Sequence, residues 1–189
     1  HSSRMRMQRV SAEELATMNQ EGLGCAGELA DGRVDIMSTA CLVAIMAQGP
    51  GYHRQVEEDF KRVVAENGAR SKVMTSAGAL IYGLKKLGAT KISLLAPYIK
   101  PLTAKVVSYI EAEGIEVLDR ISFEIPDNLE VARRDPMRLL DDAKRLKIAN
   151  ADAVVLPACV QMQSLAAIQA AEKMLGLPVT STSVCTVRN

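Results

Sequence analysis

The sequence of 189 residues contains no tryptophan, and phenylalanine and tyrosine together bring the aromatic share to only 3%. Proteins that bind single-stranded nucleic acid or sugars stack rings on aromatic side chains, so such surfaces are poorly supplied here. Charge of one sign is lacking as well, because 23 Lys and Arg stand against 22 Asp and Glu. No long-range field therefore attracts nucleic acid or an anionic membrane. We expect local groups to bind a small polar or anionic ligand.

Long hydrophobic runs are also missing. No stretch approaches the roughly 20 apolar residues of a membrane span, and the polar start at 1–9 has no signal-peptide core. These absences predict a soluble, cytoplasmic protein. Zinc patterns are absent too, since the four cysteines show no CxxC spacing and the two histidines are His1 and His53. We expect no metal site and reduced thiols.

What the sequence does contain is a thiol that occurs twice in the same setting. The apolar runs 34–40 and 153–158 are each typical of a buried parallel strand, and each ends in Ala-Cys, at Cys41 and Cys159. An apolar segment suited to a helix follows both. If the strands belong to two related halves, a pseudo-twofold axis brings the two thiols face to face across one cleft. A small molecule there can be attacked from one side and protonated from the other.

Strands and helices alternate along the chain, which predicts an α/β fold of parallel sheets with helices on both faces. The expected strands lie at 4–10, 34–41, around 73, 91–96, 115–118, 121–125, 153–159 and around 179. The expected helices lie after Ser11, at 52–67, 76–87, 102–113, after Asn128, at 136–148 and 164–175.

These elements repeat, because residues 4–10 correspond to 121–125 and residues 73–76 to 179–182. We therefore expect two pseudosymmetric Rossmann-like lobes, the first formed by 1–78 plus 178–189 and the second by 79–177. The strand and helix at 91–114 have no match before His1, and the helix after Thr75-Ser76 has no expected counterpart. The chain is predicted to be an internal portion of a longer protein, without a first strand and a last helix. The alternative is that α/β periodicity mimics a repeat.

Both repeated thiols are expected at the carboxyl ends of their strands, where open α/β sheets bind ligands. The N-terminus of a following helix favours a thiolate, so the prediction is a lowered pKa for Cys41 and Cys159. Each thiol is then a nucleophile or an acid; the alternative is a small buried hydrophobe. The matched pair favours catalysis. Cys25 and Cys185 have no such partner, and we expect them to pack.

Other polar residues have two interpretations each. The hydroxyls of Thr75 and Ser76 suit a carboxylate or an ordinary helix cap. Tyr98 follows a strand end, so its hydroxyl reaches the cleft or stays at the edge of the core. Asn128 binds a substrate carboxylate or caps the next helix. His53 is a candidate base, although its place at a helix start favours a surface or supporting role.

Six motifs along nearly the whole chain give a more specific indication. They are ACLVAIM at 40–46, GPGYH at 49–53, TSAGAL at 75–80, APYIKPLT at 96–103, EIPDNLEV at 124–131 and ACVQMQSLAA at 158–167. Together they resemble the maleate cis-trans isomerases of the aspartate/glutamate racemase superfamily. The resemblance implies a two-lobed α/β fold, a homodimer, and cofactor-free conversion of maleate to fumarate in the degradation of compounds such as nicotinate. The opening strand and closing helix of that family have no match here.

The resemblance also implies roles for individual residues. Cys41 corresponds to the nucleophile and Cys159 to the second catalytic thiol, while Tyr98 and Asn128 contact the substrate and the Thr75-Ser76 segment lines the site. Apolar residues next to the thiols suit an alkene; they are Leu42, Val43 and Val160.

The expected mechanism is addition of the Cys41 thiolate to maleate, rotation about the resulting single bond, and proton transfer by Cys159. Two alternatives remain open. One is a two-thiol racemase or epimerase acting on amino acids or hydantoins, and the other is a dicarboxylate-binding module without catalysis.

Overall fold

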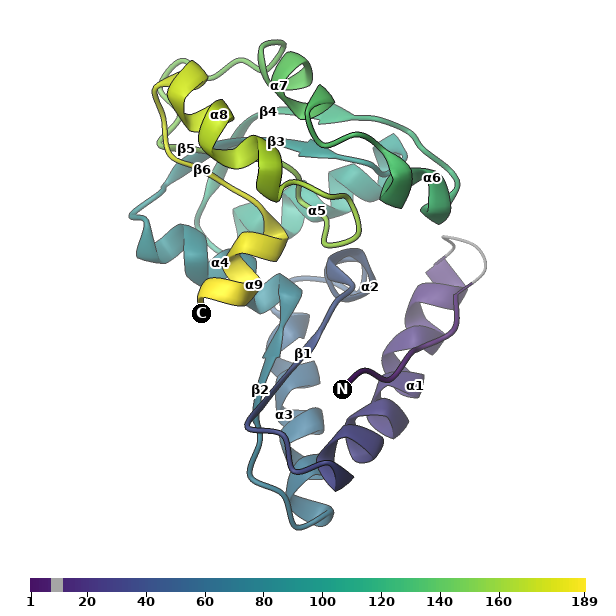
Figure 1. Cartoon of the computed structure of the whole chain (residues 1–189). Coiled ribbons are helices and arrows are strands. Elements are labelled where there is room, and N and C mark those ends of the chain that lie inside the picture. The colour runs from purple at the N-terminus through teal and green to yellow at the C-terminus, as the bar shows by residue number, and fades with distance from the viewer. Residues whose placement is uncertain (8–11) are drawn as a thin grey trace.

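The computed structural model describes residues 1–7 and 12–189, and it has the expected α/β architecture with parallel strands. A small sheet pairs β1 (Ile36–Thr39) with β2 (Lys72–Thr75). A larger sheet has the order β4 (Glu116–Ser122), β3 (Lys91–Ala96), β5 (Ala153–Val155), β6 (Val179–Thr180). Figure 1 shows the small sheet below the larger one, each flanked by helices. The helices are α1 (Ala12–Asp31), α2 (Leu42–Met46), α3 (Tyr52–Glu66), α4 (Ser76–Lys86), α5 (Lys100–Ala112), α6 (Asn128–Arg133), α7 (Arg138–Ala143), α8 (Leu165–Leu175) and α9 (Thr182–Arg188).

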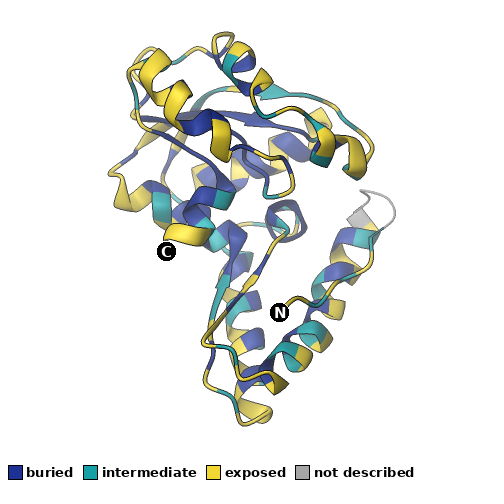
Figure 2. Ribbon diagram, in the orientation of Figure 1, coloured by how far each residue is buried: buried dark blue, intermediate teal, exposed yellow. Residues whose placement is uncertain are grey.

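Strand β3 lies inside the larger sheet, between β4 and β5. Its residues after Lys91 are all buried, as expected for a strand covered by helices on both faces. The one polar side chain among them, Ser93, donates a hydrogen bond from its Oγ to the Lys147 carbonyl at 2.6 Å. Figure 2 shows the buried residues concentrated in this sheet and on the inner sides of the helices. None of the described helices is long and apolar enough to cross a membrane.

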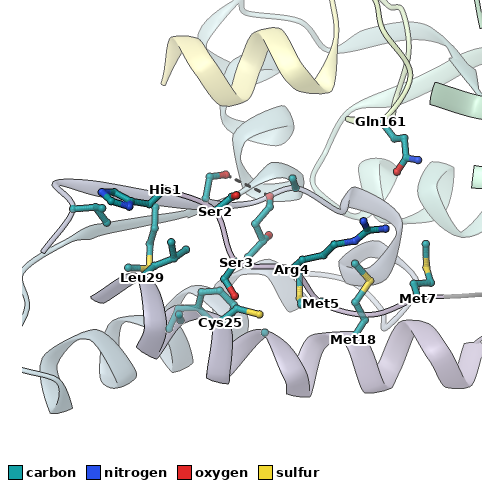
Figure 3. Close-up of a pocket in the computed structure, with 18 of the residues that line it drawn as sticks. His1, Ser2, Ser3, Arg4, Met5, Met7, Met18, Cys25, Leu29 and Gln161 are labelled. Atoms are coloured by element: carbon teal, nitrogen blue, oxygen red, sulfur yellow. Dashed lines mark hydrogen bonds between the residues drawn. The ribbon is translucent and has the colours of Figure 1, made fainter. Parts of the chain in front are cut away.

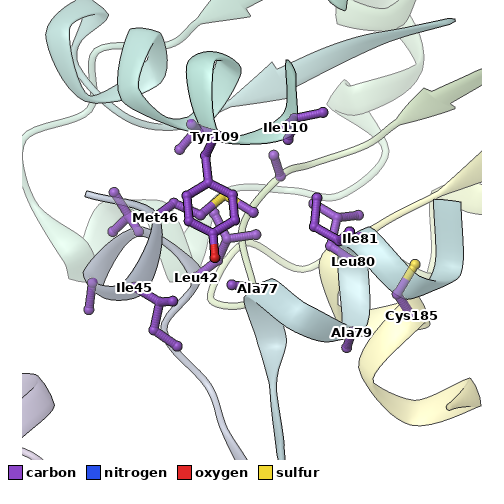
Figure 4. Packing of buried hydrophobic residues seen from close by; sticks show 14 of the residues in the cluster. Leu42, Ile45, Met46, Ala77, Ala79, Leu80, Ile81, Tyr109, Ile110 and Cys185 are labelled. Atoms are coloured by element: carbon purple, nitrogen blue, oxygen red, sulfur yellow. The ribbon is translucent and has the colours of Figure 1, made fainter. Parts of the chain in front are cut away.

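Buried side chains form two hydrophobic clusters. The first cluster joins α2, α4 and α5 and includes Leu42, Leu80 and Tyr109. Figure 4 shows Tyr109 reaching from α5 toward α2, with the apolar side chains of α4 beside it. The second cluster includes Leu139 of α7, Val154 of β5 and Ile168 of α8. Tyr98, in the loop after β3, packs against both clusters.

The expected break between strands at 115–118 and 121–125 is wrong. Strand β4 is continuous from Glu116 to Ser122, because a register shift at Ile92/Ser93 leaves Leu118 without a partner in β3. Such a bulge absorbs one residue without ending the strand. Asp119 and Arg120, which lie between the two expected segments, pair with Ser93 and Leu94 of β3.

The expectation that the helix after Thr75-Ser76 has no counterpart is also wrong. Helix α9 starts after Ser181, whose Oγ accepts a hydrogen bond from the Val184 N–H at 3.2 Å, and it packs against α4. Strand β6 pairs with β5 in the larger sheet. The lobe boundaries at 78/79 and 177/178 stay a proposal. Residues 1–7 form no strand, and the rest of the strand expected at 4–10 lies outside the described residues.

The contact between α4 and α9 leads to a stability prediction. A Cβ added at Gly83 of α4 would lie 2.6 Å from the Cys185 Sγ, whereas one added at Gly24 of α1 meets no atom within 4 Å. We expect Gly83→Ala to lower the free energy of unfolding by about 1–3 kcal/mol, because the packed contact must shift. Gly24→Ala should raise it by up to about 1 kcal/mol, as expected for alanine in a helix. Urea unfolding measures both; equal stability of the two variants would contradict the close packing of Cys185.

Candidate active site

Cys41 lies two residues beyond the end of β1 and is the N-cap residue of α2, with extended backbone at φ −131° and ψ 93°. The strand-to-helix setting expected from the sequence is therefore present. Its side chain is partly exposed and packs against the first cluster. This places the thiol at the carboxyl edge of the small sheet.

Cys159 differs from the expected setting. Strand β5 ends at Val155, and α8 begins only at Leu165, so the thiol lies within a connecting loop rather than at a helix start. Backbone hydrogen bonds hold this loop against the larger sheet: the Leu156 N–H donates to the Thr180 carbonyl at 2.7 Å, and the Ala158 N–H to the Leu95 carbonyl at 2.8 Å. The side chain of Cys159 is buried in the second cluster.

Tyr98 lies close enough to both thiols to feel their charges. It lies between β3 and α5, packs against both hydrophobic clusters, and donates a hydrogen bond to Cys159. Burial raises the pKa of Tyr98 well above its ordinary value, and the neighbouring charges of Cys159 and Cys41 raise it further. The structure thus brings together three residues that follow three different strands: Cys41, Tyr98 and Cys159.

The prediction of lowered thiol pKa values is wrong. Burial raises the pKa of Cys41 from 9.0 to about 11; the N–H groups of Ala44 and Val43 oppose this shift, and the Cys159 charge adds to it. Helix α2 has only five residues, and the Cys41 side chain makes no capping hydrogen bond. Burial also raises the pKa of Cys159, although the Tyr98 hydroxyl and the Met162 and Gln161 N–H groups act against it. Both thiols are protonated at neutral pH in the unliganded protein.

The raised pKa of Cys41 predicts a steep pH dependence. Cys41 is the nucleophile predicted from the sequence, and the thiolate is the reactive form of a cysteine. On that prediction kcat/KM and the rate of iodoacetamide alkylation at Cys41 should rise about tenfold per pH unit from about pH 7 to pH 9. The pKa of Cys41 is about 11, so its thiolate fraction keeps rising throughout this window and neither rate should reach a plateau. Peptide mass mapping of alkylated Cys41 gives the second rate independently of turnover. A plateau in both rates near neutral pH would contradict the effect of burial.

The apolar residues next to the thiols have little side chain available for a ligand. Leu42 and Val43 form the first turn of α2, and their side chains are buried in the first cluster. Their N–H groups belong to the helix start, where donors have no partner within the helix. Val160 is partly buried, and its carbonyl accepts a hydrogen bond from the Ser183 Oγ at 3.2 Å. A ligand can therefore meet Leu42 and Val43 through the backbone.

Thr75 has the capping role that was the alternative to carboxylate binding. Its Oγ1 accepts from the Gly78 N–H at 2.9 Å and donates to the Glu57 Oε1 at 2.8 Å. Ser76 differs, because its Oγ is buried without a hydrogen-bond partner among the described residues, as is the Oγ1 of Thr39. Thr39 pairs with Thr75 across the small sheet. Sequence reasoning missed Thr39, although its alternation with Met37 along β1 indicates the same buried face.

Asn128 is the first residue of α6, but it is not the cap. Asp127 caps this helix, with its Oδ1 accepting from the Leu129 N–H at 2.7 Å. Asn128 lines a cavity of about 680 Å³ together with Gln161, Ala40 and one face of α1. Figure 3 shows Gln161 across this cavity from Arg4 and Met7. Cys41 and Cys159 do not line the cavity, which adjoins their site through Ala40, the residue before Cys41.

His53 is buried rather than on the surface. Its ring and its backbone N–H both hydrogen-bond to the hydroxyl of Tyr109, the backbone bond measuring 3.0 Å. Burial lowers the pKa of His53, and the Arg54 charge lowers it further. The residue ties α3 to α5, which is the supporting role that its position favoured. Within the described ranges, no group of three or more His, Cys, Asp or Glu side chains is arranged to hold a metal ion.

Comparison with known proteins places this site in a family. The arylmalonate decarboxylase family model matches residues 6–188. A maleate isomerase from Geobacillus stearothermophilus is 59% identical over 187 residues, covering 99% of this chain and 74% of the relative. The chain belongs to the maleate isomerases of the arylmalonate decarboxylase family.

Solved maleate isomerase structures have the same fold. A Cys-to-Ala variant of maleate isomerase Iso from Pseudomonas putida S16, with maleate, superimposes with a TM-score of 0.97 at 50% identity, over 99% of this chain and 75% of that one. A Cys-to-Ser variant of the Nocardia farcinica maleate cis-trans isomerase, with a covalently bound succinylcysteine intermediate, gives a TM-score of 0.95 at 41% identity, over 98% and 76%.

Proposed function

We propose that this chain interconverts maleate and fumarate through a covalent adduct on Cys41. The observation that carries the proposal is the meeting of Cys41, Cys159 and Tyr98 at one site, after the ends of three different strands. Support comes from the maleate isomerase relatives and from the succinylcysteine adduct in the Nocardia farcinica structure. A covalent intermediate turns the double bond into a single bond, so rotation needs no cofactor.

The steps balance with the two thiols and solvent water. Water takes the Cys41 proton and returns it when Cys41 leaves the product; the Cys41 thiolate forms a C–S bond to one alkene carbon while the π electrons move toward the neighbouring carbon and its carboxylate. Cys159 donates its thiol proton to that carbon, and the Tyr98 hydroxyl stabilises the thiolate left behind. After rotation about the C–C bond, Cys159 takes the proton back and Cys41 leaves. The trans alkene is the product.

The carboxylates require donors on both sides of the thiols. We propose that the Asn128 side chain and the N–H groups of Leu42, Val43 and Val160 bind them, together with the unpaired hydroxyl of Ser76. Thr75 supports this group by capping α4. Charge develops on one carboxylate when the thiolate adds, and a preorganised donor to such charge is worth on the order of 3 kcal/mol.

Proton NMR of maleate incubated with the chain tests the function, and a growing fumarate signal is expected. Amino acids and hydantoins in heavy water test the racemase alternative, which predicts exchange of the α-proton. The binding-module alternative predicts that dicarboxylates bind but are not converted, and that binding persists when both thiols are replaced. If circular dichroism shows that the chain is folded and no fumarate forms, the proposal is contradicted.

A homodimer and a cytoplasmic location stay predictions. Size-exclusion chromatography with light scattering tests the first: a mass near 41 kDa, about twice the 20.4 kDa of one chain, is expected. A monomeric mass at assay concentration would contradict it.

A further inference from the structure

Gln161 contacts both Cys159 and Asn128. Its Nε2 donates a hydrogen bond of 2.7 Å to the backbone carbonyl of Asn128. Its backbone N–H lies by the sulfur of Cys159, two residues earlier in the same loop. Gln161 and Asn128 also line the same cavity. The residue therefore spans the distance between the second thiol and the start of α6.

Helix α6 has few other attachments near Asn128. Of its six residues only Val131 is buried, and Leu129 is 57% exposed. The nearest backbone hydrogen bonds before the helix belong to the loop that precedes it, where the Ile125 N–H donates to the Pro97 carbonyl at 2.9 Å. At the other end of α6, the Gln163 Nε2 donates to the Ala132 carbonyl at 3.3 Å. The two glutamines thus hold opposite ends of one short helix.

We propose that Gln161 is a positioning residue that fixes Asn128 relative to Cys159, so that a dicarboxylate bound by Asn128 lies within reach of the thiols. This inference rests on the proposed function and deepens it. Gln161 is exposed, and one exposed hydrogen bond contributes little to folding. Its loss should therefore affect ligand affinity far more than stability.

Gln163 supplies the matched control, because it makes the same kind of bond to the same helix but at the end away from Asn128. In Gln161→Ala we expect KM for maleate, and the dissociation constant for succinate measured by calorimetry, to rise about fivefold, with a smaller loss of kcat. Gln161→Glu keeps the shape but lacks the donor, so it should show at least the same rise. Gln163→Ala should leave both constants within about twofold of the original chain.

A double-mutant cycle tests whether Gln161 acts through Asn128. If it does, Gln161→Ala adds no further loss of succinate affinity in an Asn128→Ala background. The proposal is overturned if the two losses of succinate affinity add. It is also overturned if Gln161→Ala and Gln163→Ala weaken binding equally, or if Gln161→Ala binds succinate as tightly as the original chain. Succinate has no double bond and cannot form the adduct, so the binding series is independent of turnover. If succinate binds but maleate is not converted to fumarate, the isomerase function is contradicted. The succinate affinities of Gln161→Ala and Gln163→Ala then still test the positioning role of Gln161.

Discussion

Replacement of Cys41 by alanine should abolish the conversion of maleate to fumarate. We expect no other thiol to take its place, because Cys159 is buried in the second cluster and is assigned to proton transfer. Loss of a covalent nucleophile costs roughly four or more orders of magnitude in kcat. NMR detection of fumarate over a long incubation measures this range.

Cys25→Ala is the matched control for Cys41→Ala. Cys25 lies on α1, is partly buried, and lines the cavity beside the site without belonging to the pair of thiols. Its replacement should leave turnover near the original rate. If Cys41→Ala converts maleate to fumarate at the original rate, the covalent mechanism is ruled out.

Cys159→Ser should reduce turnover to a trace. Serine keeps the shape of the side chain and can accept the Tyr98 hydrogen bond, but its hydroxyl is a far weaker acid than a thiol. Addition needs only Cys41 and a slow proton from water, whereas removal of that proton before elimination needs the Cys159 thiolate, so the adduct on Cys41 should accumulate. We expect a fall in kcat of about a thousandfold, measured by the same NMR assay.

The melting temperature of Cys159→Ser distinguishes a chemical effect from unfolding. The site is buried, so a modest decrease in stability is expected, but the chain should remain folded at the assay temperature. Rapid isomerisation by this variant would show that the second thiol is not the proton donor.

Elements whose boundaries depend on local sequence could be predicted closely. The expected strand at 91–96 matches β3, because its mostly apolar residues lie between the helix stop at Gly88 and the loop that begins at Pro97. The expected helix at 52–67 matches α3, in which Val56, Phe60 and Val64 recur at helical spacing and are buried. The end of β5 could not be predicted in this way, since β6 offers only two residues for pairing.

In the site, too, the sequence predicts properties that depend on neighbouring residues but not those that depend on tertiary packing. The order of residues placed Cys41 before a helix, and that prediction is confirmed, but the sign of its pKa shift depends on burial by distant segments. Gln161 contacts a backbone carbonyl 33 positions away, and every residue carries such a carbonyl. Nothing in the sequence distinguished that pair.

The most direct test of covalent catalysis by Cys41 is mass spectrometry of Cys159→Ser after incubation with maleate. The account predicts that intact protein gains the mass of one maleate, and that peptide mapping places the addition on Cys41. An unmodified Cys41 in a sample that still forms fumarate would contradict the account.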